Sequence, residues 1–132
     1  MKTLAFTLVL LSSLSAFAKC DTQVEVKLFS NPFFEVQKSS EYKKLLKQFK
    51  TVGLKVTENK ESQYHTVIEA GVERGEEKDV LLSHFQIINR KGKVVFEDYR
   101  SRNIAKDKLL SGDKILSYAK RHLSAELPLC EQ

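Results

Sequence analysis

Several residue types are scarce in this chain, and each shortage excludes a class of protein. The 132 residues contain no Trp, two Cys, two Pro and five Gly, which excludes collagen-like and low-complexity chains. Two Cys are too few for a disulfide-dense miniprotein or a four-cysteine zinc site. No apolar run reaches the roughly 18 residues of a membrane span. With 42% hydrophobic and 30% charged residues, the chain fits one small globular domain.

The common catalytic and cofactor motifs are also missing. The glycines form neither a dinucleotide-binding nor a phosphate-binding loop, and no Ser occupies a nucleophile elbow. His65, His84 and His122 have no metal-ligand spacing, although the first two could meet across strands. His122 is expected at the end of the last helix, where an imidazolium complements the dipole. We therefore expect no cofactor, no metal site and no catalytic residue.

The first 18 residues predict a secretory signal peptide. A basic start at Lys2 precedes an apolar stretch over 4–14, and Ala16-Phe17-Ala18 supplies small residues for cleavage after Ala18. A membrane anchor is the alternative, but the run is short and contains Ser and Thr. Lys19 before Cys20 argues against a lipoprotein. Cleavage leaves a single α+β domain over 19–132, with 114 residues and a net charge of +4 in place of +5. This domain is expected to be periplasmic or secreted.

The two cysteines lie near the two ends of this mature chain. Cys20 is its second residue and Cys130 is the third from the end. Export to an oxidising compartment favours their pairing. A redox pair is the alternative, but the spacing is unlike Cys-x-x-Cys. The sequence predicts a Cys20–Cys130 disulfide that joins the ends of the domain.

Hydrophobic periodicity predicts two helices and five strands. One helix spans 41–52, with a cap at Ser39 or Ser40 and Gly53 at its end. Its apolar stripe comprises Tyr42, Leu45, Leu46 and Phe49. The other begins after a cap at Asp107 or Ser111 and ends near Leu123. Its expected buried stripe comprises Leu109, Leu116, Ala119 and Leu123, with Ile115 and His122 beside it. The strands are expected over 21–30, 54–57, 64–74, 80–89 and 93–100.

These elements predict an α+β fold of the order β-α-β-β-β-β-α. The first helix is long enough for a right-handed crossover, so the first two strands should be parallel. The strands 80–89 and 93–100 are joined by a short loop that ends at Gly92, which predicts an antiparallel hairpin. We expect a mixed sheet of about five strands with both helices on one face and a more polar opposite face.

Basic residues gather in two segments and form a candidate surface for an anionic partner. The residues are Lys43, Lys44, Lys47 and Lys50 of the first helix, and Arg90, Lys91 and Lys93 of the hairpin. Such a surface could attract anionic lipid or cell-wall polymer. The sequence favours a solvated face over such a binding surface, because acidic residues interrupt the pattern. Export argues against nucleic acid as the partner.

The order of the elements resembles that of small bacterial envelope modules. The residues that carry it are Gly53-Leu54-Lys55-Val56, Ile68-Glu69-Ala70-Gly71-Val72 and the hairpin from Phe85 to Phe96. They are similar to the N-terminal domain of the Tol-Pal translocation protein and to related periplasmic lipoprotein domains, over Val24 to Leu123. Tyr64-His65 departs from the acidic residue common at that position, and the lipobox is absent. The resemblance implies a non-enzymatic assembly or binding role.

Two other functions remain open at this stage. The leading hypothesis is an exported, non-enzymatic interaction or assembly module of the bacterial envelope, whose partner is another envelope protein or an anionic envelope component. One alternative is a small secreted hydrolase with His84 or His65 as general base. The other is a secreted inhibitor or effector, for which a large exposed apolar patch is expected. The oligomeric state does not follow from the sequence.

Overall fold

A computed structural model describes residues 20–124 as a five-stranded sheet with helices. The elements, in chain order, are β1 (Asp21–Leu28), a 3-10 turn η1 (Val36–Lys38), α2 (Ser40–Thr51), β2 (Lys55–Val56), β3 (Tyr64–Glu73), β4 (Asp79–Asn89), β5 (Val94–Ile104), α3 (Gly112–Ala119) and a 3-10 turn η2 (Lys120–Ser124). The expected signal peptide and Cys130 lie outside the described residues.

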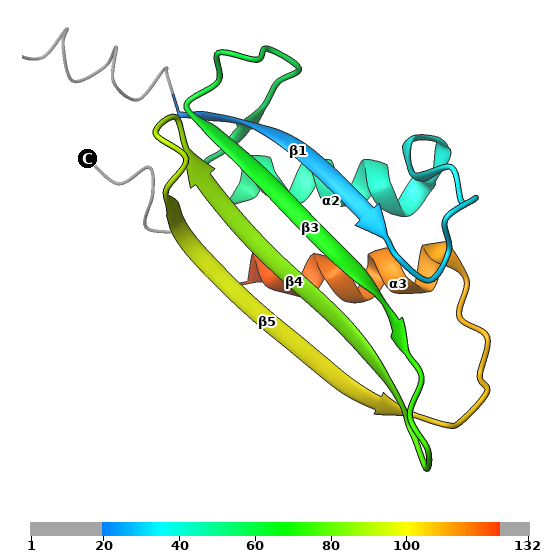
Figure 1. The fold of residues 1–132 in the computed structure, drawn as a ribbon. Helices are drawn as coiled ribbons and strands as arrows, with labels where there is room; N and C mark the ends of the chain where they lie inside the picture. Colours follow the sequence, from blue (N-terminus) through cyan, green and yellow to red (C-terminus); the bar gives the residue numbers. More distant parts are fainter. Residues whose placement is uncertain (1–19, 125–132) are drawn as a thin grey trace, which may run out of the picture.

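The strands form one mixed sheet in the order β2-β1-β3-β4-β5 (Figure 1). β1 is parallel to both β2 and β3, whereas β3–β4 and β4–β5 are antiparallel. The expected α+β class, the parallel first pair and the hairpin are confirmed. In the hairpin, Ile87 pairs with Phe96 and Ile88 with Val94, so Val95 is an extra residue that forms a β-bulge in β5.

Local sequence explains α2 well. The Ser39 side chain accepts hydrogen bonds from the backbone N–H groups of Glu41 and Tyr42, which caps the helix. Leu45 and Phe49, from the expected stripe, are fully buried. Gly53 follows the helix with a φ of 90°, a left-handed conformation that favours glycine.

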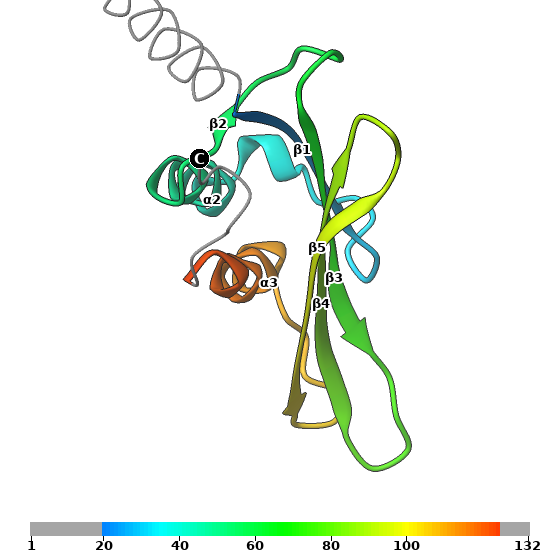
Figure 2. The same ribbon diagram turned by 90° about the vertical axis from the view of Figure 1, so that its left-hand side faces the viewer.

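Both helices cover the same face of the sheet (Figure 2). Alternation along the strands supplies the facing side chains, which are buried in β3 and β4. The central core cluster includes Leu45, Phe49, Ile68, Phe85 and Ile87. A second cluster packs α3 and includes Leu28, Ala70, Leu81, Ile115 and Leu116. The opposite face carries no helix in the described part of the chain.

The C-terminal third differs from expectation at the end of β5 and at Leu109, whereas the expected cap at Ser111 is confirmed. β5 continues to Ile104, because β4 pairs with it back to Asp79. The last helix begins only after Ser111, whose side chain accepts from the Lys114 N–H group. Leu109 therefore precedes the helix and is 85% exposed, so its expected place in the buried stripe is wrong. Leu116, Ala119 and Leu123 are buried as expected.

Candidate functional site

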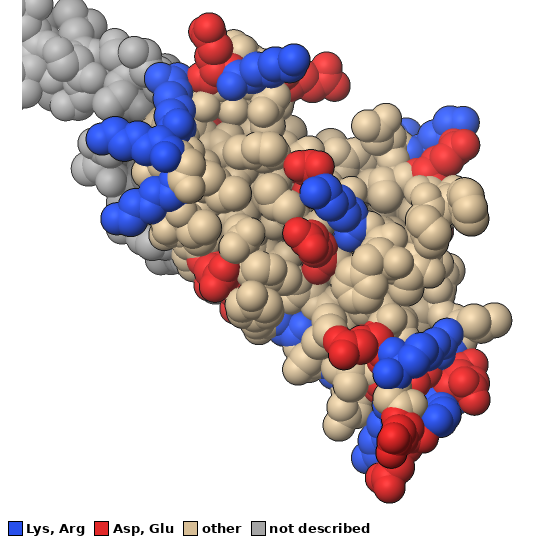
Figure 3. Space-filling model, viewed as in Figure 1, with Lys and Arg blue, Asp and Glu red and all other residues tan. Residues whose placement is uncertain are grey.

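The uncovered face of the sheet is the broadest candidate surface. Figure 3 views this face, where charged side chains gather near the two ends and only a small mixed group lies between. Its outward residues alternate with the buried ones along β1, β3, β4 and β5. Those nearest its middle include Glu25, Val67, Glu69, Leu82, His84, Gln86, Glu97 and Tyr99.

Four of these side chains form what we call the outer-face cluster: His84, Gln86, Glu97 and Tyr99. The His84 imidazole stacks on the Tyr99 ring, with centroids 3.9 Å apart and planes 5° apart. One Glu97 oxygen, Oε2, lies 3.0 Å from His84 Nε2 and accepts from Gln86 Nε2 at 2.7 Å. These two hydrogen bonds, that from Gln86 first, lower the pKa of Glu97. Tyr99 as a whole residue remains 69% exposed.

The strand register brings the outer-face cluster together. His84 pairs directly with Tyr99, and Gln86 pairs with Glu97. Directly opposed side chains on one face are the neighbours that interact in an antiparallel pair. The sequence pattern indicates His84 as a candidate but does not indicate its three partners. The partners follow from the strand register: pairing residues outward from the turn at Gly92, with one residue skipped for the bulge at Val95, places these side chains side by side.

His65 lies elsewhere on the same face, with its own carboxylate. Its Nε2 is 3.4 Å from Glu25 Oε2, and it borders hollows of about 390 and 590 Å³. In the β3–β4 pair, Glu69 is opposite His84, and His65 is four residues away along β3. The two imidazoles are therefore not joined at one site. Within residues 20–124, no group of three or more His, Cys, Asp and Glu side chains is placed to hold a metal ion.

A second polar group lies on the helix side, and we call it the buried relay: Ser83, His122 and Asp98. His122 Nε2 is 2.7 Å from Ser83 Oγ, and His122 Nδ1 is 2.7 Å from Asp98 Oδ2. Arg100 Nε also donates to Asp98 Oδ2, at 3.0 Å. The His122 ring stacks at 18° on Phe85, with centroids 5.2 Å apart. The relay therefore joins η2 to β4 and β5.

Burial sets the charge of the relay. Desolvation lowers the pKa of His122, although Asp98 opposes the shift. Burial alone would raise the pKa of Asp98, but hydrogen bonds from His122 and Arg100 outweigh it and lower the pKa. A neutral imidazole beside an ionised carboxylate donates from Nδ1 to Asp98 and accepts the Ser83 hydroxyl at Nε2. The expected imidazolium at a helix end is therefore wrong for His122.

The relay has the hydrogen-bond order of a Ser-His-Asp catalytic triad but lacks access. A nucleophilic Ser must reach a substrate carbonyl, and Ser83 is 1% exposed while His122 is fully buried. Sequence analysis found no such pattern, because the three residues come from three elements. One signal was present in the sequence: Ser83 and Asp98 are polar residues at inward-facing positions of β4 and β5, which indicates a buried polar group. Glu97 and Asp98 are adjacent in β5 and point to opposite faces of the sheet, one into each group.

The candidate basic residues form two separate groups. All seven are exposed, and Figure 2 draws α2 and the β4–β5 turn on opposite sides of the sheet. Arg90 at the turn donates to the carbonyl oxygens of Glu61, at 2.6 Å, and Ser62, at 3.3 Å. On α2, Lys44 pairs with Glu41 at 3.4 Å. The arrangement does not join the two segments into one continuous surface, and anion binding by either stays a prediction.

Comparisons with known proteins find only distant likenesses in structure. No protein-family model and no curated protein matches the chain. The PelC dodecamer from Paraburkholderia phytofirmans is 15% identical, with 83% of this chain and 89% of that chain covered and a TM-score of 0.44. Lipoprotein GNA1162 from Neisseria meningitidis is 11% identical, with 82% and 99% covered and a TM-score of 0.46. The similar structures thus include a bacterial lipoprotein, and they do not show a Tol-Pal domain.

Proposed function

We propose that this chain is an exported, non-enzymatic interaction or assembly module of the bacterial cell envelope. Export is supported by the signal-like residues 1–18. No helix in the described part of the chain is long and apolar enough to cross a membrane. The expected partner is another envelope protein. The site of binding is the uncovered face of the sheet, centred on the outer-face cluster.

The observation that carries this proposal is the exposed but ordered Tyr99. Its ring is held flat against His84, and His84 is oriented by Glu97, so the exposed aromatic surface is fixed before a partner arrives. Aromatic residues are enriched in the centres of protein interfaces. A ring held in place loses little side-chain entropy on binding. Tyr99 therefore has the properties of an interface anchor.

Site-specific photo-crosslinking in cells tests the proposal. A benzophenone amino acid is placed at Tyr99, and in a matched chain at Gln48, which is exposed on α2 on the helix side of the sheet. We expect one discrete crosslinked product from position 99 and none of that size from position 48. A Glu97→Ala change in the position-99 chain should reduce the product, because it releases His84 from its carboxylate.

Two results would contradict the binding face. Equal products from positions 99 and 48 would mean that contact is non-specific. No product from position 99, while full-length chain is recovered from the envelope fraction, would mean that this face is not engaged. Recovery of the chain with residues 1–18 intact in the cytoplasmic fraction would instead contradict export.

A second candidate function, hydrolysis, is favoured by the hydrogen-bond order of the buried relay. The base in that case is His122, not His84 or His65, because among the contacts within residues 20–124 it is His122 that lies between a hydroxyl and a carboxylate. A fluorophosphonate probe separates the two functions. The interaction module leaves Ser83 unlabelled in the folded chain, whereas a hydrolase would show labelling that Ser83→Ala abolishes.

A further inference from the structure

A groove on the helix side of the sheet is lined by four cationic side chains. It lies between the end of β5, the segment 105–110 and α3, with a volume of about 420 Å³. The cations are Arg102, Lys108, Lys114 and Arg121. No Asp or Glu is among the lining residues that the structure describes. None of the four belongs to the basic segments singled out by sequence.

We propose that this cationic groove binds an organic phosphate ester. Several cations around one hollow concentrate positive potential there and attract a multivalent anion. Arg and Lys side chains form charge-assisted hydrogen bonds with phosphate oxygens. The volume fits a small molecule or a headgroup and is small for a folded partner.

Three of the four cations have no side-chain partner within residues 20–124. The side chains of Arg102, Lys108 and Lys114 make no hydrogen bond or ion pair there, and all three are exposed. Arg121 lies over the Tyr118 ring, with its guanidinium carbon 5.4 Å from the centroid. Elsewhere in the fold, cations such as Arg74, Arg100 and Lys120 pair with carboxylates. Arg102, Lys108 and Lys114 thus bring to the groove three charges that residues 20–124 do not neutralise.

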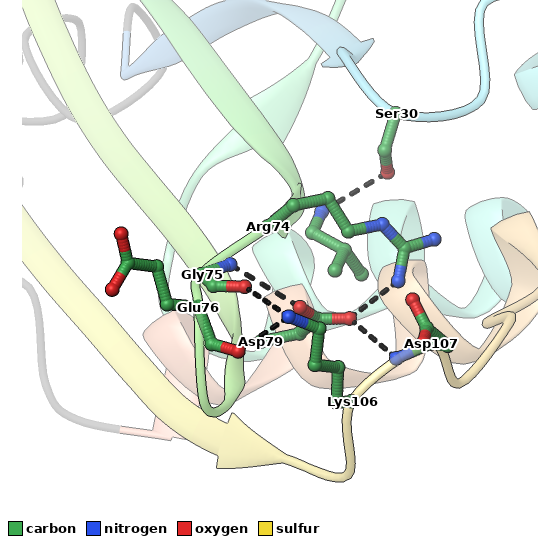
Figure 4. A network of polar contacts seen from close by, with 8 residues as sticks. Ser30, Arg74, Gly75, Glu76, Asp79, Lys106 and Asp107 are labelled. Carbon is green, nitrogen blue, oxygen red and sulfur yellow. Dashed lines mark hydrogen bonds and ion pairs between the residues drawn. The ribbon is translucent and has the colours of Figure 1, made fainter.

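The segment that carries Lys108 is fixed by a buried carboxylate (Figure 4). Asp79 is fully buried and accepts hydrogen bonds from the Arg74 guanidinium, from Gly75 N at 3.2 Å and from Asp107 N at 2.9 Å. Burial alone would raise the pKa of Asp79, but these bonds lower it, so the carboxylate is ionised at neutral pH. Lys106 binds the carbonyl oxygens of Gly75 and Glu76. One wall of the groove is therefore held in position before a ligand arrives.

The lining explains why an ester fits better than a bare inorganic ion. Apolar groups of Leu81, Ile104, Leu110 and Tyr118 line the groove beside the cations. An organic group attached to the phosphate can bury apolar surface against them. The groove lies on the helix side and the outer-face cluster on the other, so this inference does not rest on the proposed partner-binding face.

Nuclear magnetic resonance titration tests the site directly. Glycerol 3-phosphate is added to the ¹⁵N-labelled mature chain at low salt, and backbone amide shifts are followed. We expect saturable shifts that are largest between residues 102 and 121. The double variant Arg102→Gln/Lys114→Gln should bind about tenfold more weakly or worse, because it removes two charged donors. The matched control Lys55→Gln/Lys60→Gln removes the same charge at exposed positions outside the groove and outside both basic segments, and it should bind as the parent does.

Vesicle sedimentation identifies the source of the ester. Binding to phosphatidylglycerol vesicles, with loss in the groove double variant, assigns a lipid headgroup. Binding of glycerol 3-phosphate without vesicle binding assigns a soluble ester. Equal weakening in both double variants would show an effect of net charge alone and would overturn the proposal. No saturable shift with glycerol 3-phosphate and no vesicle binding would overturn it as well. Thermal unfolding of each variant confirms that it is folded.

Discussion

At the scale of single residues, His122 shows how burial changes the role of a side chain. On the surface it would be a cation near a helix end. Inside, it links Ser83 to Asp98 and stacks on Phe85. A buried polar side chain contributes to stability only while all of its partners stay hydrogen-bonded. Two predictions follow from that condition.

The first concerns removal of the imidazole. In His122→Ala, the Ser83 hydroxyl and one bond to Asp98 lose their partner, and a cavity forms beside Phe85. We expect the free energy of unfolding to fall by about 2–4 kcal/mol. Urea denaturation measures this fall. Lys47→Ala, at an exposed position, should stay within about 0.5 kcal/mol of the parent. An equal and small effect of both changes would show that the relay does not contribute to stability.

The second concerns pH. The pKa of His122 is lower in the folded chain than its ordinary value of 6.5, so between those two values the unfolded chain binds more protons. The free energy of unfolding should therefore be fully developed above pH 6.5 and fall as pH drops below it, by at most about 1.4 kcal/mol per pH unit from this residue. Urea titrations at pH 7.5 and 5.5 measure the difference. In His122→Asn the fall over this window should be smaller, and an unchanged fall would assign it to other groups.

At the scale of elements, the sequence predicted structure best where one local pattern decides it. Three features depend only on residues close in the sequence: the apolar stripe of α2 that ends at Phe49, the helix cap at Ser39 and the turn at Gly92. The start of α3 was less predictable, because Asp107 and Ser111 are both good caps. The Asp107 N–H group is instead bound by Asp79, 28 residues earlier, and the Asp107 φ is 61°. A non-local hydrogen bond thus keeps that residue out of the helix.

The same element provides a third prediction. A Cβ at Gly112, the first residue of α3, would lie 2.4 Å from the Phe34 ring, and one at Gly71 would lie 2.8 Å from the Phe29 ring. Phe29 is 52% exposed and can turn away, whereas Phe34 packs into the core cluster around α3. Gly112→Ala should therefore lower the free energy of unfolding by about 1–3 kcal/mol despite a better helix propensity, and Gly71→Ala by less. Denaturation of both variants compares them, and the reverse order would refute this packing argument.

The candidate sites were less predictable than the elements that carry them. The outer-face cluster depends on the pairing of His84 with Tyr99, and the buried relay depends on where η2 meets β4. The cationic groove collects side chains from β5, α3 and the segment between them. Single-sequence periodicity gives the face of each residue but not its neighbour on another element. Cross-strand register and helix placement supply that information.

At the scale of the whole molecule, the expected disulfide provides a fourth prediction. Cys20 is buried in the central core cluster with Phe49 and Leu123, and its expected partner Cys130 lies outside the described residues. A Cys20–Cys130 bond would close a loop of roughly 100 residues, worth up to about 4.7 kcal/mol in the chain-entropy model. Mass mapping without reductant should find one linked peptide pair in exported material. Two free thiols would refute the bond.

Its energetic effect is measured separately. Reduction with a mild thiol, or the double change Cys20→Ser/Cys130→Ser, should lower the urea midpoint. Reductant added to the double variant is the control, because it should change nothing further. If reductant also leaves the parent unchanged, the two ends of the chain are not joined covalently.

The bulge at Val95 also determines which side chains of β5 point to each face of the sheet. Adjacent residues there serve opposite sides: Glu97 binds outward to His84, and Asp98 binds inward to His122. A shift of one residue in the register of β5 against β4 would exchange the directions of these two side chains. Glu97 would then point among apolar side chains, and His122 would lose its hydrogen bond to a carboxylate. Polar contacts on both faces of β5 therefore disfavour a shifted register of this strand against β4. The register that exposes Tyr99 on the outer face is the same one that places Asp98 beside His122.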